Sequence, residues 1–569
     1  MVKKEITKRE NKQIFSSLGF DEDPFQYTNA DEETRLTDYF VPPPYFPSVF
    51  GDPDHPKSFV VFAPRGGGKS AQRRIIENTC EANGVLSITY DQFEFPEIKN
   101  PNDVNLYYHL KNIIRFALMG LLVTLNDNPK LKESLSKQDK EIFVRLATEY
   151  LSDISELSFK TALDSLKSIK DKVRDFWDEW LPIINIGFST ILKKLVDTSL
   201  GPLEKFSNPG NEKSPYQKYN LELVIKLAQK LGFRSIYVLI DRVDEAELTG
   251  NNTTLSFHLI ESMLRDLDLL EMKGIAFKFF LWDQLEPFYQ EIARTDRIKQ
   301  ETLEWDDEML LNMWEKRLLA YSQKKVSCLE QVSEILIPSV DELAVIFANH
   351  SPRDMIRVGA QIVSEQQELN VNSEKLTKPA ILRGIEKFCS RRSTEILTSN
   401  TLTDLRKIQQ VDFTIPYLAN TVFHEAQATT RNRIMRWRRE GSIVDVEKID
   451  NPNPNQKTQV KLMAIQDIRV AKVIHSDMDV LTFLKLKYKK CPYCGTNLLR
   501  DWGDDQSGTR CHACQSDITD DSKIKTWDQW KQKESAAEFR RKFRKEVKET
   551  GQFPLPFGEQ ISNSEDNEE

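Results

Sequence analysis

The stretch "APRGGGKS", from Ala63 to Ser70, constrains this chain more than any other feature of its sequence. It matches the phosphate-binding pattern G-x-x-x-x-G-K-[ST], the Walker A pattern, with Ala63 in place of the first glycine. The apolar run "SFVVFAP" leads into it, and a helical pattern begins near Lys69. A buried strand, a glycine-rich turn and a helix N-terminus in this order direct backbone N–H groups and the helix dipole at one anion. The pattern therefore predicts a loop that binds nucleotide phosphates.

Each residue type in this loop has an expected role. The glycines let the backbone approach phosphate oxygens, Lys69 neutralises the β and γ phosphates, and the Ser70 hydroxyl coordinates Mg²⁺. We expect the nucleotide to contact Ala63, Pro64, Arg65, Gly66, Gly67, Gly68, Lys69, Ser70 and Ala71. The alternative is a glycine-rich turn between a strand and a helix that binds no ligand.

Four short runs of β-branched and aromatic residues predict the sheet. They cover 58–64, 84–91, 235–241 and 275–283, with helical patterns between them. Such runs are typical of a parallel sheet covered on both faces. We therefore predict an α/β fold, a P-loop NTPase parallel sheet with a large helical insertion at about 105–231, then a helical lid, a winged-helix domain and a small zinc ribbon.

The expected domain boundaries follow these patterns. They are an N-terminal lead-in (1–57), the P-loop ATPase core (58–335), the helical lid (336–400), the winged-helix-like domain (401–480), the zinc ribbon (481–525) and a basic helix with an acidic tail (526–569). The lid opens with "SVDELAVIF", in which Ser339 as N-cap and Glu342 three residues later predict a capping box.

A second motif, "IYVLIDRVDE", ends an apolar strand in Asp241 and has the form called Walker B. We expect Asp241 to hold Mg²⁺ through water, because an acid at the end of such a strand, in a chain with a Walker A loop, is specific for this role. Asp244 and Glu245 are both candidates for the base that orients the attacking water. A strand that ends in aspartate without a ligand is the alternative.

Four of the seven cysteines form two C-x-x-C pairs sixteen residues apart. They are Cys491, Cys494, Cys511 and Cys514. This spacing predicts four thiolates around one Zn²⁺, with His512 between the ligands as a possible substitute. Four protein ligands leave no position for water, so we expect the site to be structural and not catalytic. Such modules bind nucleic acid or dock proteins, and the cysteines alone favour neither.

The segment 414–447 reads as helix, turn, helix and strand, and the hairpin with the loop 450–457 completes a winged-helix pattern. The second helix is expected to start after Thr429 and Thr430, to bury Ile434 and Trp437, and to stop at Gly441. Five arginines are left to its exposed surface: Arg431, Arg433, Arg436, Arg438 and Arg439. Lys485, Lys487, Lys489 and Lys490 would extend this basic surface.

This basic helix is a candidate for binding the phosphates of double-stranded DNA. The alternative is that the arginines form a solvated face or pair with acids of another domain.

The composition fits a folded protein in water. Hydrophobic residues make up 39% and charged residues 29% of the chain, and the net charge is −8. The longest apolar stretch, 180–192, is shorter than the roughly 20 residues that a membrane-spanning helix needs. No secretory signal is visible in "MVKKEITKRENKQIF", so we expect a cytoplasmic protein without a membrane partner.

From about Ser58 to Leu397, the chain resembles prokaryotic P-loop ATPases of the AAA+ and STAND type, including NACHT-like and KAP-like members. The resemblance implies an ATP-binding and ATP-hydrolysing switch or motor with Mg²⁺, which couples nucleotide state to DNA or partner engagement, in bacterial anti-phage defence. It also implies a homo-oligomer and a separately encoded effector protein. Core, lid and winged helix in this order also look like origin-recognition ATPases. The alternative is a weakly hydrolysing regulatory scaffold that binds ATP and recruits a partner protein.

The resemblance also suggests roles for further residues. Ordinary AAA+ ATPases have glutamate directly after the Walker B aspartate, where this chain has Arg242. We expect this departure to affect the rate of hydrolysis and not nucleotide binding. The segment "HSPRDMIRVGAQI" resembles the sensor 2 segment of AAA+ lids, in which Arg353 would reach the γ-phosphate. A salt-bridged surface arginine is the alternative.

Two further pairs of residues are weaker candidates. Asp283 and Gln284 take the place of a sensor 1 polar residue at the end of the fourth strand. Arg294 and Arg297 could act as arginine fingers across a subunit interface, although a solvated face is the favoured interpretation there.

Overall fold

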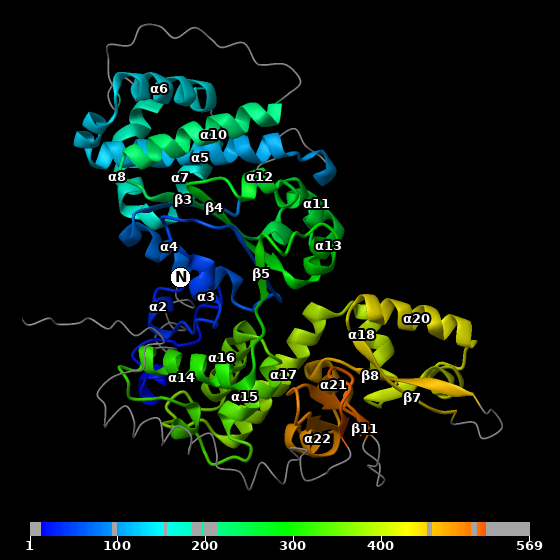
Figure 1. The fold of residues 1–569 in the computed structure, drawn as a ribbon. Helices are drawn as coiled ribbons and strands as arrows, with labels where there is room; N and C mark the ends of the chain where they lie inside the picture. Colours follow the sequence, from blue (N-terminus) through cyan, green and yellow to red (C-terminus); the bar gives the residue numbers. More distant parts are fainter. Residues whose placement is uncertain are drawn as a thin grey trace, which may run out of the picture. The chain divides into compact units, whose positions relative to one another are not determined.

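The fold is taken from a computed structural model, which describes residues 13–93, 100–152, 156–184, 196, 213–451, 458–501 and 509–518 (Figure 1). The chain divides into two compact units. The first unit comprises Met1–Val332 and Ala344–Lys375, and the second comprises Ser333–Leu343 and Leu376–Glu569. The basic helix and acidic tail expected at 526–569, and most of the hairpin loop at 450–457, lie outside the described residues.

A five-stranded parallel sheet forms the centre of the first unit, with the strand order β2-β3-β4-β1-β5. The strands are β1 Phe59–Ala63, β2 Val85–Tyr90, β3 Ser235–Ile240, β4 Ile275–Trp282 and β5 Lys299–Thr302. All four predicted runs form strands. The fifth strand was not predicted, because its sequence "KQET" is polar and its side chains alternate between exposed and half-buried at the edge of the sheet.

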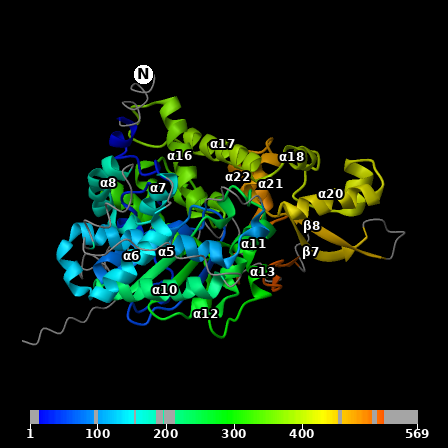
Figure 2. The ribbon, with the colours of Figure 1, turned by 90° about the horizontal axis from the view of Figure 1, so that it is seen from above.

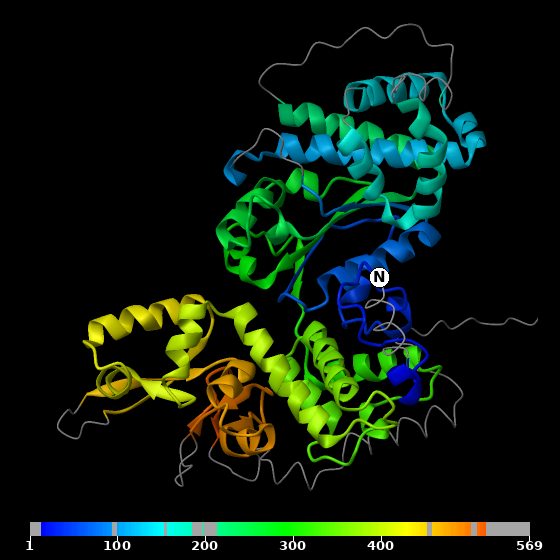
Figure 3. The same ribbon diagram turned by 180° about the vertical axis from the view of Figure 1, so that it is seen from behind.

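Helices cover both faces of this sheet, as its uninterrupted apolar strands require. Val60 and Phe62 of β1 belong to a core that includes residues of α5 (Leu106–Asp127) and α10 (Lys213–Lys230). Phe59 and Val61 point to the other face, where residues of α4 (Lys69–Cys80) and α3 (Phe46–Phe50) cover them. Figures 1 and 3 show α5 and α10 on one side of the sheet and α4 on the other.

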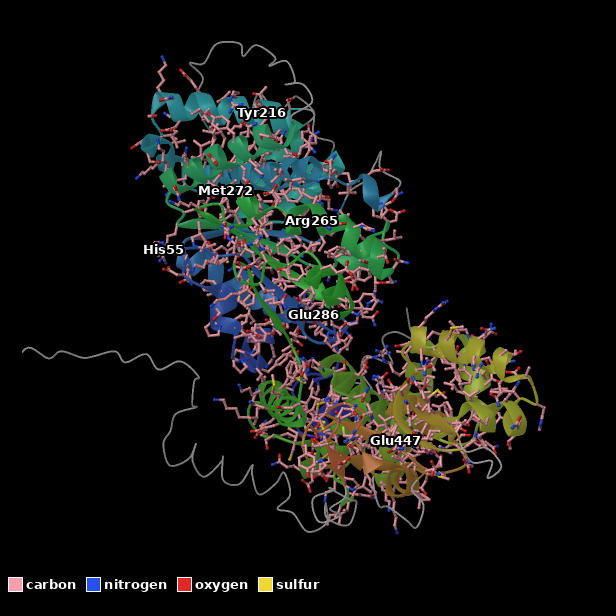
Figure 4. The ribbon with its side chains drawn as sticks, turned by 45° about the vertical axis from the view of Figure 1, so that its right-hand side comes forward. His55, Tyr216, Arg265, Met272, Glu286 and Glu447 are labelled. Carbon is pink, nitrogen blue, oxygen red and sulfur yellow. The ribbon has the colours of Figure 1, made fainter. Side chains whose placement is uncertain are left out.

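In its described residues, the insertion predicted at about 105–231 consists mainly of helices. Its helices are α5, α6 Lys137–Leu151, α7 Glu156–Asp164, α8 Lys170–Ile184 and α10. Viewed from above, α5, α6 and α10 lie side by side (Figure 2). Tyr216 of α10 is labelled within this layer in Figure 4, and its hydroxyl donates to Glu149 Oε2 of α6 at 2.9 Å.

The N-terminal lead-in packs into the first unit and forms the short helices α2 (Leu36–Tyr39) and α3. Its anchor is Arg317 of α14 (Asp307–Tyr321), whose buried guanidinium lies 2.8 Å from Glu33 Oε2 and donates to Tyr27 O at 3.0 Å. The Tyr321 hydroxyl also donates to Glu33, at 2.5 Å. This segment is therefore part of the wall of the first unit.

Further helices complete the first unit and the predicted lid. They are α11 Thr253–Leu264, α12 Leu267–Leu270, α13 Glu286–Gln290, α15 Val340–Ala348, α16 Pro352–Leu369 and α17 Lys378–Ile396. The capping box predicted at the start of α15 is present: Ser339 N donates to Glu342 Oε2 at 2.8 Å, and Glu342 N donates to Ser339 Oγ at 3.3 Å. The division between the units runs through the predicted lid, with α16 in the first unit and α17 in the second.

The second unit contains an antiparallel sheet with the order β6-β8-β7. Its elements are α18 Ser399–Arg406, β6 Asp412–Thr414, α19 Ile415–Tyr417, α20 Gln427–Arg439, β7 Ile443–Asp450, β8 Gln459–Ile465, α21 Ile468–Ile474, α22 Val480–Lys487, β9 Tyr488–Lys490, β10 Asn497–Leu499, β11 Thr509–Arg510 and β12 Asp517–Ile518. Glu447 of β7, labelled in Figure 4, accepts a hydrogen bond from Arg500 Nη1 at 3.2 Å.

The structure confirms the buried residues predicted for helix α20, but the predicted start of this helix is wrong. Ile434 and Trp437 are buried, and Gly441 follows the helix with a φ of 64°. The helix begins at Gln427, earlier than expected, with Ala426 as N-cap. Thr430 does not cap it, because its hydroxyl donates to Glu425 Oε1 at 3.0 Å. Among the described helices of the chain, none is both long enough and apolar enough to span a bilayer.

Candidate functional site

The glycine-rich loop lies between the strand β1 and the helix α4, in the order that its sequence predicts. Gly68, the residue before α4, has a φ of 98°, which favours glycine. At Gly67, a Cβ atom would lie 2.9 Å from Pro64 O, closer than any side chain tolerates. The carbonyl of Gly67 accepts a hydrogen bond from Trp305 Nε1 at 2.7 Å. The loop therefore needs glycine at Gly67 and Gly68 for its backbone conformation, and the Trp305 indole stabilises it with a hydrogen bond.

Lys69 and Ser70 occupy the first turn of α4 and line a cavity of about 310 Å³. The Lys69 ammonium donates to Ala63 O at 2.8 Å and to Pro64 O at 3.1 Å, so it lies folded against its own loop. Burial lowers the pKa of Lys69, and the neighbouring carboxylates of Asp244 and Asp241 counter this effect in part. A cation already surrounded by backbone acceptors can exchange them for phosphate oxygens.

The same cavity reaches the end of β3, the first turn of α16 and the N-terminal segment. Asp241 and Arg353 line it together with the loop. Apolar and aromatic side chains of several elements complete its wall: Leu36, Tyr39, Phe40, Val41, Met313 and Ile356. Sequence reasoning did not predict the contribution of the N-terminal segment, because that segment carries no nucleotide-binding motif.

Asp241 is buried, and protein donors contact both of its oxygens. Its Oδ2 accepts from Arg73 Nε at 2.9 Å, and its Oδ1 accepts from the Arg242 backbone N–H at 2.9 Å. The guanidinium of Arg73 is fully buried and also pairs with Glu77 and, at 2.5 Å, with Asp31 Oδ1. Burial alone would lower the pKa of Arg73, but the three carboxylates outweigh it and raise the pKa.

Arg73 is a site residue that sequence reasoning missed. The available signal was its position one helical turn after Lys69, with Glu77 four residues further on the same helix face. The oxygens at this place are of the kind that Mg²⁺ prefers, a hydroxyl from Ser70 and a carboxylate from Asp241. A carboxylate has about four lone-pair sites, so Asp241 keeps acceptor capacity beyond its two hydrogen bonds.

The structure distinguishes the two candidate bases. Asp244 is buried, and Arg65 Nε donates to its Oδ2 at 2.9 Å while the Arg65 guanidinium lies 4.1 Å from the centroid of the Trp282 ring. Glu245 has an exposed carboxylate, with 59% of its side chain accessible, and it lines the cavity beside Ser70. Both acids line the cavity, and Glu245 is the more accessible of the two.

Arg353 lies against the loop, at the start of α16. Its backbone N–H donates to Gly66 O at 3.4 Å, and a Cβ atom on Gly66 would lie 3.1 Å from Arg353 Cβ. Within the described part of the chain, no ion pair of Arg353 is found. Arg353 therefore lies beside the glycine-rich loop, and the described residues do not show the salt bridge that the alternative interpretation requires.

The remaining candidates of the first unit differ in position. Asp283 follows β4 directly, where burial raises the pKa of its carboxyl and the Lys69 ammonium acts against this rise. Gln284 is exposed in the same short 3-10 helix. Arg297 pairs with Glu271, and Arg294 with Asp296 at 3.4 Å, all of them at the surface and away from the lining of the cavity.

The four predicted metal ligands of the second unit lie together, with all four sulfur atoms within 4.8 Å of one another. Cys491 Sγ is 3.7 Å from Cys514 Sγ, and Cys494 Sγ is 3.7 Å from Cys511 Sγ. A tetrahedron of sulfurs about 2.3 Å from a central zinc has edges of about 3.8 Å. The antiparallel pairs β9–β10 and β11–β12 carry these cysteines. The cluster therefore has the size that Zn²⁺ requires, and it could bind zinc.

The arginines of α20 are largely paired within the second unit. Arg433 donates to Asp404 at 2.9 Å and to Glu425 at 3.0 Å, Arg436 pairs with Asp404, and Arg438 pairs with Asp445. Arg431 and Arg439 are exposed, and no ion pair of either is found among the described residues. The acids therefore come from the same unit, not from another domain as the alternative supposed.

The expected basic surface next to α20 needs a correction. Lys485 is exposed, as predicted, and Lys487 pairs with Asp501. Lys489 and Lys490 are buried, at 8% and 7% exposure, because they lie in the strand β9, which pairs with β10. Two of the four lysines are thus unavailable to a large partner.

No protein-family model matched this chain, and no curated protein matched it. The site must therefore be interpreted from its own geometry.

Proposed function

We propose that the first unit binds ATP with Mg²⁺ in the cavity at the carboxyl end of β1 and β3 and hydrolyses it. One observation carries this proposal: Lys69 and Ser70, at the N-terminus of α4, line the same cavity as the Asp241 carboxylate. A helix N-terminus, a lysine and a carboxylate that face one space form a site for a metal-bound phosphate chain.

Each side chain has a proposed part in binding. Lys69 exchanges its two loop carbonyls for the β and γ phosphates, and Ser70 with Asp241 would hold Mg²⁺, which screens the phosphate charge when bound. The aromatic and apolar wall from Leu36 to Val41, with Met313, offers a surface for the nucleoside.

Glu245 is the proposed acid that orients the attacking water, because its carboxylate is accessible and lines the cavity. Asp244, held by Arg65, positions the loop instead. Arg353 would contact the γ-phosphate from the start of α16. Its place next to Gly66 supports the proposed sensor role.

The second unit supports a proposed link between nucleotide state and a partner. The element order α18, β6, α19, α20, β7, β8 and the sheet order β6-β8-β7 are those expected of a winged helix. Because three of the five arginines of α20 already pair with acids, any duplex DNA contact would depend on Arg431 and Arg439. We propose an AAA+ or STAND-type switch that engages a partner, with the cysteine cluster as a structural zinc site.

One observation favours the second candidate function, a weakly hydrolysing scaffold. The Arg73 guanidinium neutralises Asp241, the residue that would organise Mg²⁺. Such pairing permits nucleotide binding but slows hydrolysis if it persists in the bound state.

Titration calorimetry with ATP and Mg²⁺, followed by phosphate release, tests both functions. We expect wild-type protein to bind ATP, and Lys69→Ala to abolish hydrolysis and weaken binding. Arg265→Ala, a change of an exposed arginine on the surface (Figure 4), serves as a matched control. Binding without turnover would favour the scaffold. Absence of any nucleotide binding by wild-type protein would refute the proposal.

A further inference from the structure

Arg242 has an unusual backbone conformation at the centre of the site. It follows Asp241 directly and has φ 57° and ψ 26°, in the left-handed region that residues other than glycine rarely adopt. Its N–H donates to Asp241 Oδ1 at 2.9 Å, and the short 3-10 helix Val243–Glu245 begins immediately after it. Outliers of this kind cluster at functional sites, where the surrounding structure enforces them.

The Arg242 side chain also lines a space of about 410 Å³ that adjoins the nucleotide cavity and shares with it every lining residue except Arg357. Three arginines line this space: Arg242, Arg353 and Arg357. Glu245 is the acid among its lining residues. Arg357 pairs with Asp354 at 3.3 Å and Arg242 pairs with Asp31, and each guanidinium keeps N–H donors beyond its pair beside the Ser70 hydroxyl. Such a space favours an anion of high charge density.

Asp31 holds the guanidinium of Arg242 at this cavity. Arg242 Nη2 donates to Asp31 Oδ2 at 2.6 Å, and Asp31 Oδ1 is 2.5 Å from Arg73 Nη2. Arg242 Nε lies 3.9 Å from the nearest Glu245 oxygen, too far for a hydrogen bond. A guanidinium has five N–H donors, so the bond to Asp31 leaves capacity for phosphate oxygens.

We propose that Arg242 contacts the γ-phosphoryl group of ATP from within the same chain, an inference that rests on the proposed function. In hydrolysis, the water oxygen forms a bond to the γ-phosphorus while the bond from that phosphorus to the bridging oxygen breaks. ADP leaves with the electron pair, and Glu245 accepts a proton from the water. Arg242 stabilises the negative charge on the γ-phosphoryl oxygens, as an arginine supplied in cis can do.

The test measures hydrolysis and the binding of two nucleotides by full-length protein. Arg242→Gln keeps the length of the side chain and removes its charge. We expect kcat to fall by about 10²- to 10³-fold, the usual cost of removing one donor that stabilises charge in the transition state. We expect the affinity for a non-hydrolysable ATP analogue to fall about 10-fold or more, because a charge-assisted hydrogen bond is lost. ADP affinity is expected to stay unchanged, since ADP lacks the γ-phosphoryl group. Arg265→Gln is the surface control.

A second variant covers the case in which Arg242→Gln fails to fold. Arg242→Gly suits the positive φ, and millimolar guanidinium ion should restore part of its turnover. Wild-type rates in the soluble variants, or an equal loss of ADP and analogue affinity, would overturn the assignment. Failure of the wild-type protein to bind any nucleotide would instead refute the proposed function itself.

Discussion

Arg73 Nε lies 2.9 Å from Asp241 Oδ2, and neither side chain is more than 2% exposed. The ion pair links the helix after the glycine-rich loop to the end of β3. Because Arg73 also contacts Glu77 and Asp31, one guanidinium joins α4, β3 and the N-terminal segment. The two halves of the proposed phosphate site are therefore held together by a charge network as well as by the sheet.

The first prediction concerns this network. Arg73→Met would leave buried carboxylates without a cation, and we expect it to lower the free energy of unfolding by about 3–5 kcal/mol. Arg73→Lys keeps the charge but cannot reach three carboxylates in one plane, so we expect a smaller loss, about 1–3 kcal/mol. Denaturant unfolding checks both, with Arg265→Met as a surface control. Equal stability of all variants would contradict the network.

The second prediction is a pH dependence caused by Lys278 of β4. This lysine is 1% exposed, its Nζ donates to Lys57 O at 2.6 Å, and burial lowers its pKa to about 7. An unfolded lysine has a pKa of about 10.4, so between these values the unfolded chain binds a proton that the folded chain does not. Lys278 therefore lowers the free energy of unfolding, and this loss grows as the pH falls from about 10 to 7.

Substitution of Lys278 measures this effect. We expect Lys278→Met to be more stable than wild-type protein at pH 7, by an amount on the order of 2–4 kcal/mol. The advantage should shrink toward pH 10. Thermal unfolding of both proteins across this range gives the difference, and a difference that is independent of pH would show that Lys278 stays charged when buried.

The third prediction concerns the cysteine cluster. We expect one zinc ion per purified chain, released by a thiol-reactive mercurial and measured with a chromogenic chelator. Cys491→Ser should lose this zinc and destabilise the second unit. Cys389→Ala, a change of a buried cysteine elsewhere in that unit, should retain it. Zinc retained in Cys491→Ser would contradict the proposed ligand set.

The fourth prediction separates the arginines of α20. The double variant Arg431→Glu, Arg439→Glu alters two exposed side chains, so we expect unchanged stability and weaker binding to a short DNA duplex. The slope of log affinity against log salt should fall by about 2. Identical binding at several salt concentrations would show that these arginines form only a solvated face.

Arg433→Glu is the contrasting variant. It places a third carboxylate between Asp404 and Glu425, and we expect a loss of about 1–3 kcal/mol in the free energy of unfolding. A loss of DNA binding by this variant would therefore result from reduced folding stability and not from the loss of a phosphate contact.

The sequence was most informative where local chemistry decides the structure. The apolar strands, the glycine loop, the capping box at Ser339 and the buried Trp437 follow from periodicity and backbone preferences, which act over a few residues. The strand β5 could not be predicted from its polar sequence, because backbone pairing with β1 is what holds it at the sheet edge. Two ion-pair partners could not be predicted because they lie far away in the chain. Asp404 is 29 residues from Arg433, and Asp31 is 42 residues from Arg73.

The bond from Trp305 Nε1 to Gly67 O has a practical consequence. Trp305 O in turn accepts a hydrogen bond from His350 Nδ1 at 2.8 Å, just before the turn that leads into α16. The Trp305 indole thus contacts the loop while its backbone carbonyl contacts His350, so we expect a rearrangement of the loop to change the emission of Trp305. Trp305 is one of nine tryptophans, so a variant that keeps only this one would carry a fluorophore at the loop whose signal can be followed in stopped-flow mixing, without a dye or label.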